Sequence, residues 1–303
     1  MSKKEMYILN IGHNIKKGKY NLHSKFKNVF NYSIDRDIVS LVSSEVGSGP
    51  NNIVLSKFPE FAKKTMTISN NKLIIGNTAL QIDFSEPQTL ENIFLNNRSD
   101  LLKKIEILID NISDKISTKS LGFLLFPENE VFFKTAFEKA FLNHVKKTIT
   151  NIFLEKLPVI TKKMKGTGFG LTPSGDDFNC GVLYALNYLN RHSRSTPMHM
   201  SVPDSGAELK LEVASGDLSE IIEECYSNSV GNNLISNTFL KYAYLNLYYE
   251  NFYELLKALK QNNTKNISYY AEKVINSGHT SGSDMITGFI LTIKGVLNDQ
   301  KSG

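Results

Sequence analysis

The spacing of hydrophobic and polar positions changes once along the chain, close to Pro87. Before this residue, short runs rich in Ile, Val, Leu and Phe alternate with turn residues such as GSGPNN at 47–52. The runs are MYILNIG, DIVSLVSSEV, NNIVL, KLIIGN and ALQIDF. No long helical pattern lies between them. We therefore expect a small antiparallel β domain, a barrel or a sandwich, over residues 1–87.

Beyond Pro87 the apolar residues recur at i, i+3, i+4 and i+7, which is typical of amphipathic helices. Helices are predicted in TLENIFLNN, after Ser99-Asp100, and in most of the remaining chain. One stretch, 192–216, breaks the pattern with Ser, Pro and small residues, and we expect a flexible loop there. Its Met-His-Met run at 198–200 is more typical of a solvated loop than of a soft metal site. The prediction is an α+β protein with a helical domain over 88–303.

Two helix starts in this domain share the pattern S-G-x-D-(apolar)-x-x-G. One is SGDDFNCG at 174–181, within the glycine-rich stretch GFGLTPSGDDFNCG, and the other is SGSDMITG at 281–288. A Ser followed by an acid three residues later is close to a capping box. On that interpretation Ser174 and Ser281 are N-caps, and the carboxylates three residues on fold back onto them.

The glycines that end the two motifs call for a further explanation. Gly181 and Gly288 lie inside predicted helices, where Gly is about 1 kcal/mol less favourable than Ala. Close approach of another backbone would offset this, because a side chain would clash there. We therefore expect the two helices to cross tightly near their starts and to bring the two motifs together.

Two adjacent helix N-termini would form a site for a phosphate or a carboxylate, because their unpaired N–H groups and dipoles favour anions. Nearby glycines at 166, 168, 170 and 175 would let a ligand approach the backbone, and Lys162, Lys163 and Lys165 could supply charge. Asn and Ser side chains of the segment 227–246, with Asn232 or Asn233 as a helix cap, could line the same cavity. The expected anion-binding residues are Gly170, Thr172, Ser174, Gly175, Asp177, Thr280, Ser281, Gly282 and Asp284.

His279 and Asp176 are the candidates for catalysis. His279 precedes the second motif and could transfer protons near neutral pH, although a structural hydrogen-bonding role is equally open. Asp176 is the acid that capping does not explain. With Asp177 and Asp284 it could hold Mg²⁺ through oxygen ligands, whereas zinc is disfavoured because no cysteine is near. A Ser–His–Asp nucleophile is weaker, because no strand–turn–helix elbow precedes either Ser.

Composition narrows the class of protein. The 303 residues carry a net charge of +5, and the chain has four arginines and no basic stripe, which disfavours a nucleic-acid binder. Its two cysteines lack metal-ligand spacing and are expected to be free thiols in a reducing compartment. The N-terminus lacks the apolar run of a signal peptide, and no run suits a membrane span. We expect a soluble, cytoplasmic protein with no membrane partner.

Several of these segments resemble the AllH-like family, named for a subunit of oxamate carbamoyltransferase. They are GLTPSGDD at 170–177, GHTSGSD at 278–284, ISNTFLKYA at 235–243 and GPNNI at 49–53. The resemblance implies a subunit that works with two other, unrelated subunits in anaerobic allantoin and purine breakdown. There oxalurate and phosphate interconvert with oxamate and carbamoyl phosphate. A non-catalytic subunit, binding small carboxylates or phosphates or acting as a scaffold, is the alternative.

Overall fold

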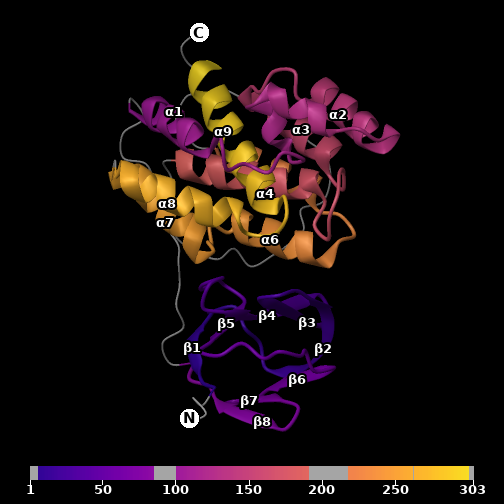
Figure 1. Ribbon diagram of the computed structural model, residues 1–303, viewed down its shortest axis with the longest axis vertical. Coiled ribbons are helices and arrows are strands. Elements are labelled where there is room, and N and C mark those ends of the chain that lie inside the picture. Colours follow the sequence, from indigo (N-terminus) through magenta and orange to yellow (C-terminus); the bar gives the residue numbers. More distant parts are fainter. Residues whose placement is uncertain (1–5, 85–99, 191–217, 262, 300–303) are drawn as a thin grey trace.

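The computed structural model describes residues 6–84, 100–190, 218–261 and 263–299 (Figure 1). The helix expected in TLENIFLNN and the loop expected at 192–216, with its Met-His-Met run, lie outside these ranges. Within them, a β region is followed along the chain by a helical region, which confirms the α+β class.

The β region is one eight-stranded sheet in the order β1-β5-β4-β3-β2-β6-β7-β8. Its strands are β1 Ile8–Ile11, β2 Gly18–Lys25, β3 Val29–Ile34, β4 Asp37–Ser43, β5 Asn52–Leu55, β6 Thr65–Ile68, β7 Lys72–Ile75 and β8 Thr78–Gln81. Alternate side chains face the core: in β7, Leu73 and Ile75 are buried, whereas Lys72 and Ile74 are exposed. The expectation of a purely antiparallel sheet is wrong at one pair, because β4 and β5 are parallel, with Ser40 opposite Asn52. The chain between them, residues 44–51, returns to the middle of β4, where Asn52 pairs with Ser40.

The helical region surrounds one central pair of helices, α4 and α9 (Figure 1). Its α-helices are α1 Leu101–Ile112, α2 Ala136–Thr148, α3 Leu157–Met164, α4 Ser174–Leu189, α5 Ser219–Ser229, α6 Leu234–Tyr244, α7 Glu250–Gln261, α8 Thr264–Ile275 and α9 Ser281–Asp299. Short 3₁₀ helices are η1 Leu121–Leu124, η2 Pro127–Phe132 and η3 Leu154–Lys156. All 16 residues of α4 are buried, so this helix is the centre of the core.

The two helices of the central pair touch backbone to backbone. A Cβ on Gly181 would lie 2.0 Å from the carbonyl oxygen of Met285 in α9. A Cβ on Gly288 would lie 2.2 Å from the carbonyl oxygen of Phe178 in α4. Any side chain at either position would displace the partner helix. The tight crossing predicted from the two glycines is therefore confirmed.

The sheet is joined to the helices through the turn at residues 47–52. The backbone N–H of Ser48 donates to the Glu250 carboxylate at 2.6 Å, and the N–H of Glu250 donates to the Ser48 carbonyl at 2.9 Å. The Tyr249 hydroxyl donates to Asn51 Oδ1 at 2.8 Å. Gly49 lies against the Tyr249 ring, where an added Cβ would come within 2.4 Å of a ring carbon. The GPNNI segment thus attaches the β region to the start of α7.

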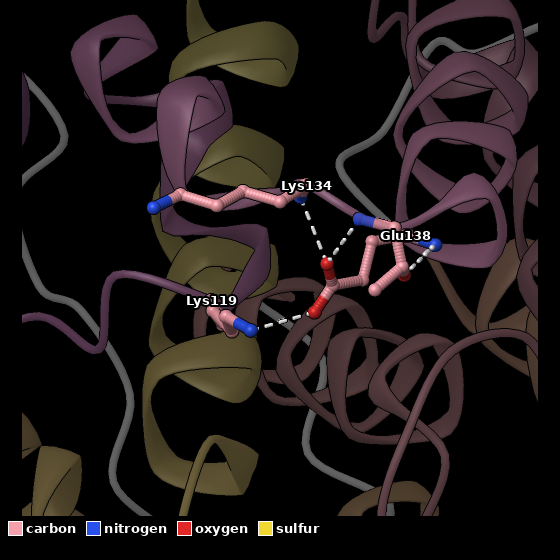
Figure 2. A network of polar contacts seen from close by, with 4 residues as sticks. Lys119, Lys134 and Glu138 are labelled. Carbon is pink, nitrogen blue, oxygen red and sulfur yellow. Dashed lines mark hydrogen bonds and ion pairs between the residues drawn. The ribbon is translucent and has the colours of Figure 1, made fainter.

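A capping box fixes the start of α2 (Figure 2). The Glu138 carboxylate accepts from the backbone N–H groups of Lys134 and Thr135, both at 2.8 Å, and from Lys119 Nζ at 2.6 Å. The Thr135 hydroxyl accepts from the Glu138 N–H in return. The hydrogen bond from Lys119, followed by those from the two backbone N–H groups, lowers the pKa of Glu138 to about 2. Its charge therefore links the segment before η1 to α2.

The two cysteines and the lengths of the helices bear on what composition predicts. Cys180 and Cys225 are both free and buried, as expected for thiols without a disulfide. Among the helices in the described ranges, none is long and apolar enough to cross a membrane.

Candidate functional site

The two S-G-x-D motifs meet at the starts of α4 and α9. The hydroxyl oxygens of Thr172, which lies two residues before the first motif, and of Ser281, which begins the second, are 3.1 Å apart. Thr172 Oγ1 donates to Asp177 Oδ2 at 2.9 Å. The expected proximity of the two motifs is therefore confirmed, and a contact between side chains joins them.

Two buried carboxyl groups, those of Asp177 and Asp284, lie in the two motifs that this contact joins. Burial raises the pKa of Asp284 to about 7. The pKa of Asp177 is also raised well above its usual range, first by burial and then by the charge of Asp284. Asp284 Oδ1 accepts from the Leu121 N–H at 2.6 Å, whereas its Oδ2 is buried with no hydrogen-bond partner among the described residues. Burial therefore favours the protonated form of both carboxyl groups.

The capping interpretation is wrong in its details at the first motif. The N-cap of α4 is Pro173, with no side-chain cap, and Ser174 is the first helical residue. Asp177 bonds to Thr172, and Asp284 to the backbone of Leu121 in η1, so both carboxyls tie their helices to other segments. Beside Asp284, the Ser283 hydroxyl accepts from the Ser117 N–H at 3.0 Å. No pattern in the sequence marks Ser283 as important, because its partner is a distant backbone group.

The motif glycines mostly serve packing. A Cβ on Gly175 would lie 1.9 Å from the Met164 carbonyl oxygen, and one on Gly282 would lie 1.8 Å from that of Val274. Their missing side chains leave room for neighbouring backbone rather than for a ligand. Gly166, Gly168 and Gly170 differ, because their φ angles of 69°, 100° and 95° are ones that other residues rarely adopt. Gly166 also faces open space.

A pocket of about 480 Å³ opens beside the start of α4. It is lined by Lys165, Gly166, Pro173, Asp176, Val230, Gly231, Asn232 and Asn233. Of the residues expected to catalyse or to bind the anion directly, only Asp176 is in this lining, together with Gly166, which was expected to let a ligand approach the backbone. The expectation that Lys165 and the Asn pair at 232–233 share a cavity with the first motif agrees with this geometry.

Asp176 and Lys165 give the pocket its charge. Asp176 is 4% exposed, and its Oδ1 accepts from the Gly166 N–H at 2.7 Å. Burial raises the pKa of Asp176, while the Gly166 hydrogen bond and the Lys165 charge act in the opposite direction. Lys165 is exposed, and its Nζ donates to the Val230 carbonyl at 3.3 Å. A buried carboxyl with a raised pKa and an exposed cation therefore share one pocket.

Two asparagines fix the conformation of residues 230–233, which line the pocket just before α6. Asn233 caps α6 by accepting from the N–H groups of Ile235 and Ser236, both at 3.0 Å, as the sequence predicts. Its Nδ2 donates to the Leu171 carbonyl at 2.6 Å. Asn237 accepts from the Gly231 N–H and donates to the Gly231 carbonyl. Sequence reasoning missed Asn237, whose backbone partner lies six residues earlier.

The other predicted residues lie outside the pocket lining. Gly170 is exposed, Thr172 and Thr280 are buried, and His279 is exposed with no hydrogen bond within the described chain. Three acids do not gather as expected for Mg²⁺: no cluster of three or more His, Cys, Asp or Glu side chains suited to a metal occurs in the described ranges. The oxygens of Asp176, Asp177 and Asp284 instead accept from three different groups.

Two family models match the chain. The model described as oxamate carbamoyltransferase subunit AllH matches residues 164–293, which include both motifs and all the pocket residues. The model described as the AllH family N-terminal domain matches residues 3–89, which include the sheet. Comparison with curated proteins and with solved structures returns no match.

Proposed function

Because the chain belongs to the AllH family, we propose that it is the subunit of a carbamoyltransferase that binds a small anionic substrate in the pocket beside α4. The substrates of this reaction are oxamate and carbamoyl phosphate, or oxalurate and phosphate in reverse. The observation that carries the proposal is the placement of Lys165 and Asp176 in one pocket at a helix N-terminus.

The charges of the pocket suit these substrates. Oxamate, oxalurate, phosphate and carbamoyl phosphate are all small anions, and the Lys165 ammonium and the positive end of the α4 dipole favour them. The Asn232 side chain is exposed in the pocket and offers amide groups that match a carbamoyl group. The bonds of Asn233 and Asn237 hold the wall in place before substrate binds, which lowers the entropy lost on binding.

Asp176 is the residue proposed for proton transfer. When the oxamate nitrogen attacks the carbamoyl carbon, an N–C bond forms, the C–O bond to phosphate breaks, and phosphate leaves. The nitrogen then loses a proton, which the Asp176 carboxylate accepts. A pKa raised by burial makes this carboxylate a stronger base than an exposed one. His279, which is exposed outside the pocket lining, is a second candidate for this step.

Two variants of the pocket test the proposal. Phosphate should raise the melting temperature of the isolated wild-type chain, and Lys165→Met should remove that rise, because the ammonium is lost. Lys139→Met, exposed on α2, is the matched control. Asp176→Asn should leave the melting temperature nearly unchanged, because Asn still accepts from Gly166. It should reduce turnover of the assembled enzyme about 100-fold.

The outcomes separate this proposal from the alternative. Phosphate stabilisation that survives Lys165→Met would remove the pocket as the anion site. Full turnover in both Asp176→Asn and His279→Gln, measured with the partner subunits present, would leave this chain a binding or scaffolding role. The hydrogen bonds of Asp177 and Asp284 favour a structural role for these two carboxyls, because their partners, Thr172 and Leu121, belong to the chain itself.

A further inference from the structure

An apolar patch lies beside the pocket, on the outer side of α2 and the loop after α3. It consists of Phe137, Phe169 and Leu171. Phe137 is 63% exposed and Leu171 42% exposed, while Phe169 is half-buried. The Phe169 ring stands edge-on to Phe137 at 5.3 Å and to the buried Phe141 at 5.1 Å. The Phe169 ring therefore connects the exposed Phe137 ring to the core.

The same loop builds the patch and the pocket. Residues 165–173 place Lys165, Gly166 and Pro173 in the pocket lining and present Phe169 and Leu171 to solvent. Three glycines with positive φ allow this path. The Leu171 carbonyl accepts from Asn233, which itself lines the pocket. A protein seated on the patch would therefore lie at the edge of the pocket.

The surroundings of the patch are basic. Residues 157–173 contain Lys162, Lys163 and Lys165 and no Asp or Glu. Lys162 and Lys163 are exposed and have no ion pair within the described chain. His144 Nε2 contacts the Lys163 carbonyl at 3.1 Å, which places the end of α3 against the helix that carries Phe137. The patch is thus bordered by positive charge.

We propose that this patch binds an acidic segment, with apolar side chains, of a partner subunit of the carbamoyltransferase, and that the partner covers one edge of the pocket. The inference rests on the proposed function, which requires partner subunits. Exposed aromatic side chains in an apolar patch are features of subunit interfaces, and Lys162 and Lys163, which have no ion pair within the described residues, would attract acidic side chains of a partner. The helix α2, which carries Phe137, lies on the side of the helical region away from the sheet (Figure 1).

The test measures the affinity of the full chain for the other purified subunits of the enzyme. Phe137→Asp should weaken binding at least about tenfold, because it places a charge in the apolar contact. Phe61→Asp is the matched control, since Phe61 is 75% exposed in the β region. Reversal of charge in Lys162→Glu/Lys163→Glu should also weaken binding and reduce its dependence on salt, whereas Lys260→Glu on α7 should do neither.

Each result decides the inference. Equal affinities for Phe137→Asp and Phe61→Asp would overturn it, and so would complete failure of the wild-type chain to bind those subunits. Loss of self-association in Phe137→Asp, with unchanged affinity for the other subunits, would assign the patch to a second copy instead. The phosphate-dependent rise in melting temperature of the isolated chain reports on Lys165 separately, so failure here and failure of the pocket are distinguishable.

Discussion

Asp284 belongs to the second S-G-x-D motif, and its carboxyl stabilises the fold by binding the backbone of η1. Its carboxyl accepts from the Leu121 N–H, and burial raises its pKa from 3.8 to about 7. The folded protein therefore binds this proton more tightly than the unfolded chain does. The stability it contributes is fully present below about pH 4 and is lost as the pH rises through 7. Burial of Asp177 acts in the same direction.

Replacement of Asp284 by Asn should flatten the dependence of stability on pH. Asn keeps an oxygen for the Leu121 N–H but has no proton to lose. The free energy of unfolding of the wild-type protein should fall by up to about 4 kcal/mol between pH 4 and pH 8 because of Asp284. Asp284→Asn should lose much less, as measured by urea unfolding across this range. Asp110→Asn on α1 is the control, and equal slopes in all three proteins would contradict the prediction.

At the scale of elements, the α4–α9 crossing depends on two absent side chains. Gly288→Ala would bring a Cβ within 2.2 Å of the Phe178 carbonyl oxygen, and backbone cannot yield as a side-chain tip can. We expect a loss of about 3 kcal/mol or more in the free energy of unfolding.

Gly231→Ala is the control for this crossing, because its Cβ would meet only the Lys165 side chain, at 3.5 Å. It should change stability by less than about 1 kcal/mol. Thermal unfolding of the two variants measures the difference. A mild effect in Gly288→Ala would mean that the helices can separate slightly without loss of packing.

The same elements show what the sequence could predict. Apolar periodicity predicted strands before helices, and Gly181 and Gly288 predicted the crossing, because Gly inside a helix needs a local reason. The parallel β4–β5 pair could not be predicted, since alternation does not reveal strand direction. Leu121 and Ser117, the partners of Asp284 and Ser283, could not be predicted either, because backbone donors carry no mark in the sequence.

The residues of the candidate site also divide into those that the sequence predicts and those that only the fold reveals. Asp176 is predictable as a site residue because helix capping does not explain it, and it lines the pocket. His279 is a candidate because imidazole can transfer protons, but the fold leaves it exposed and outside the lining of the pocket. The role of Asn237 depends on the path of residues 230–233, which tertiary packing determines.

At the scale of the whole molecule, the β region and the helical region meet through a small set of polar contacts. Ser48 exchanges two hydrogen bonds with Glu250, one of them to a charged carboxylate, and Asn14 Nδ2 donates to the Tyr242 hydroxyl at 2.7 Å. Gly49 allows the turn to lie flat against Tyr249. Both matched family regions contribute to this contact, which couples the stability of the sheet to that of α7.

Glu250→Ala should uncouple the two regions. The Ser48 N–H would lose a charged acceptor, a change of about 1–3 kcal/mol when the donor is left partly buried. Amide exchange should then become faster at residues 47–52 and at the start of α7, while the α4–α9 core keeps its protection. Glu254→Ala, four residues along the same helix, removes only a surface pair with Lys257 and should leave the turn protected. Unchanged exchange at 47–52 in Glu250→Ala would show that the Tyr249 and Asn14 contacts hold the regions together without this carboxylate.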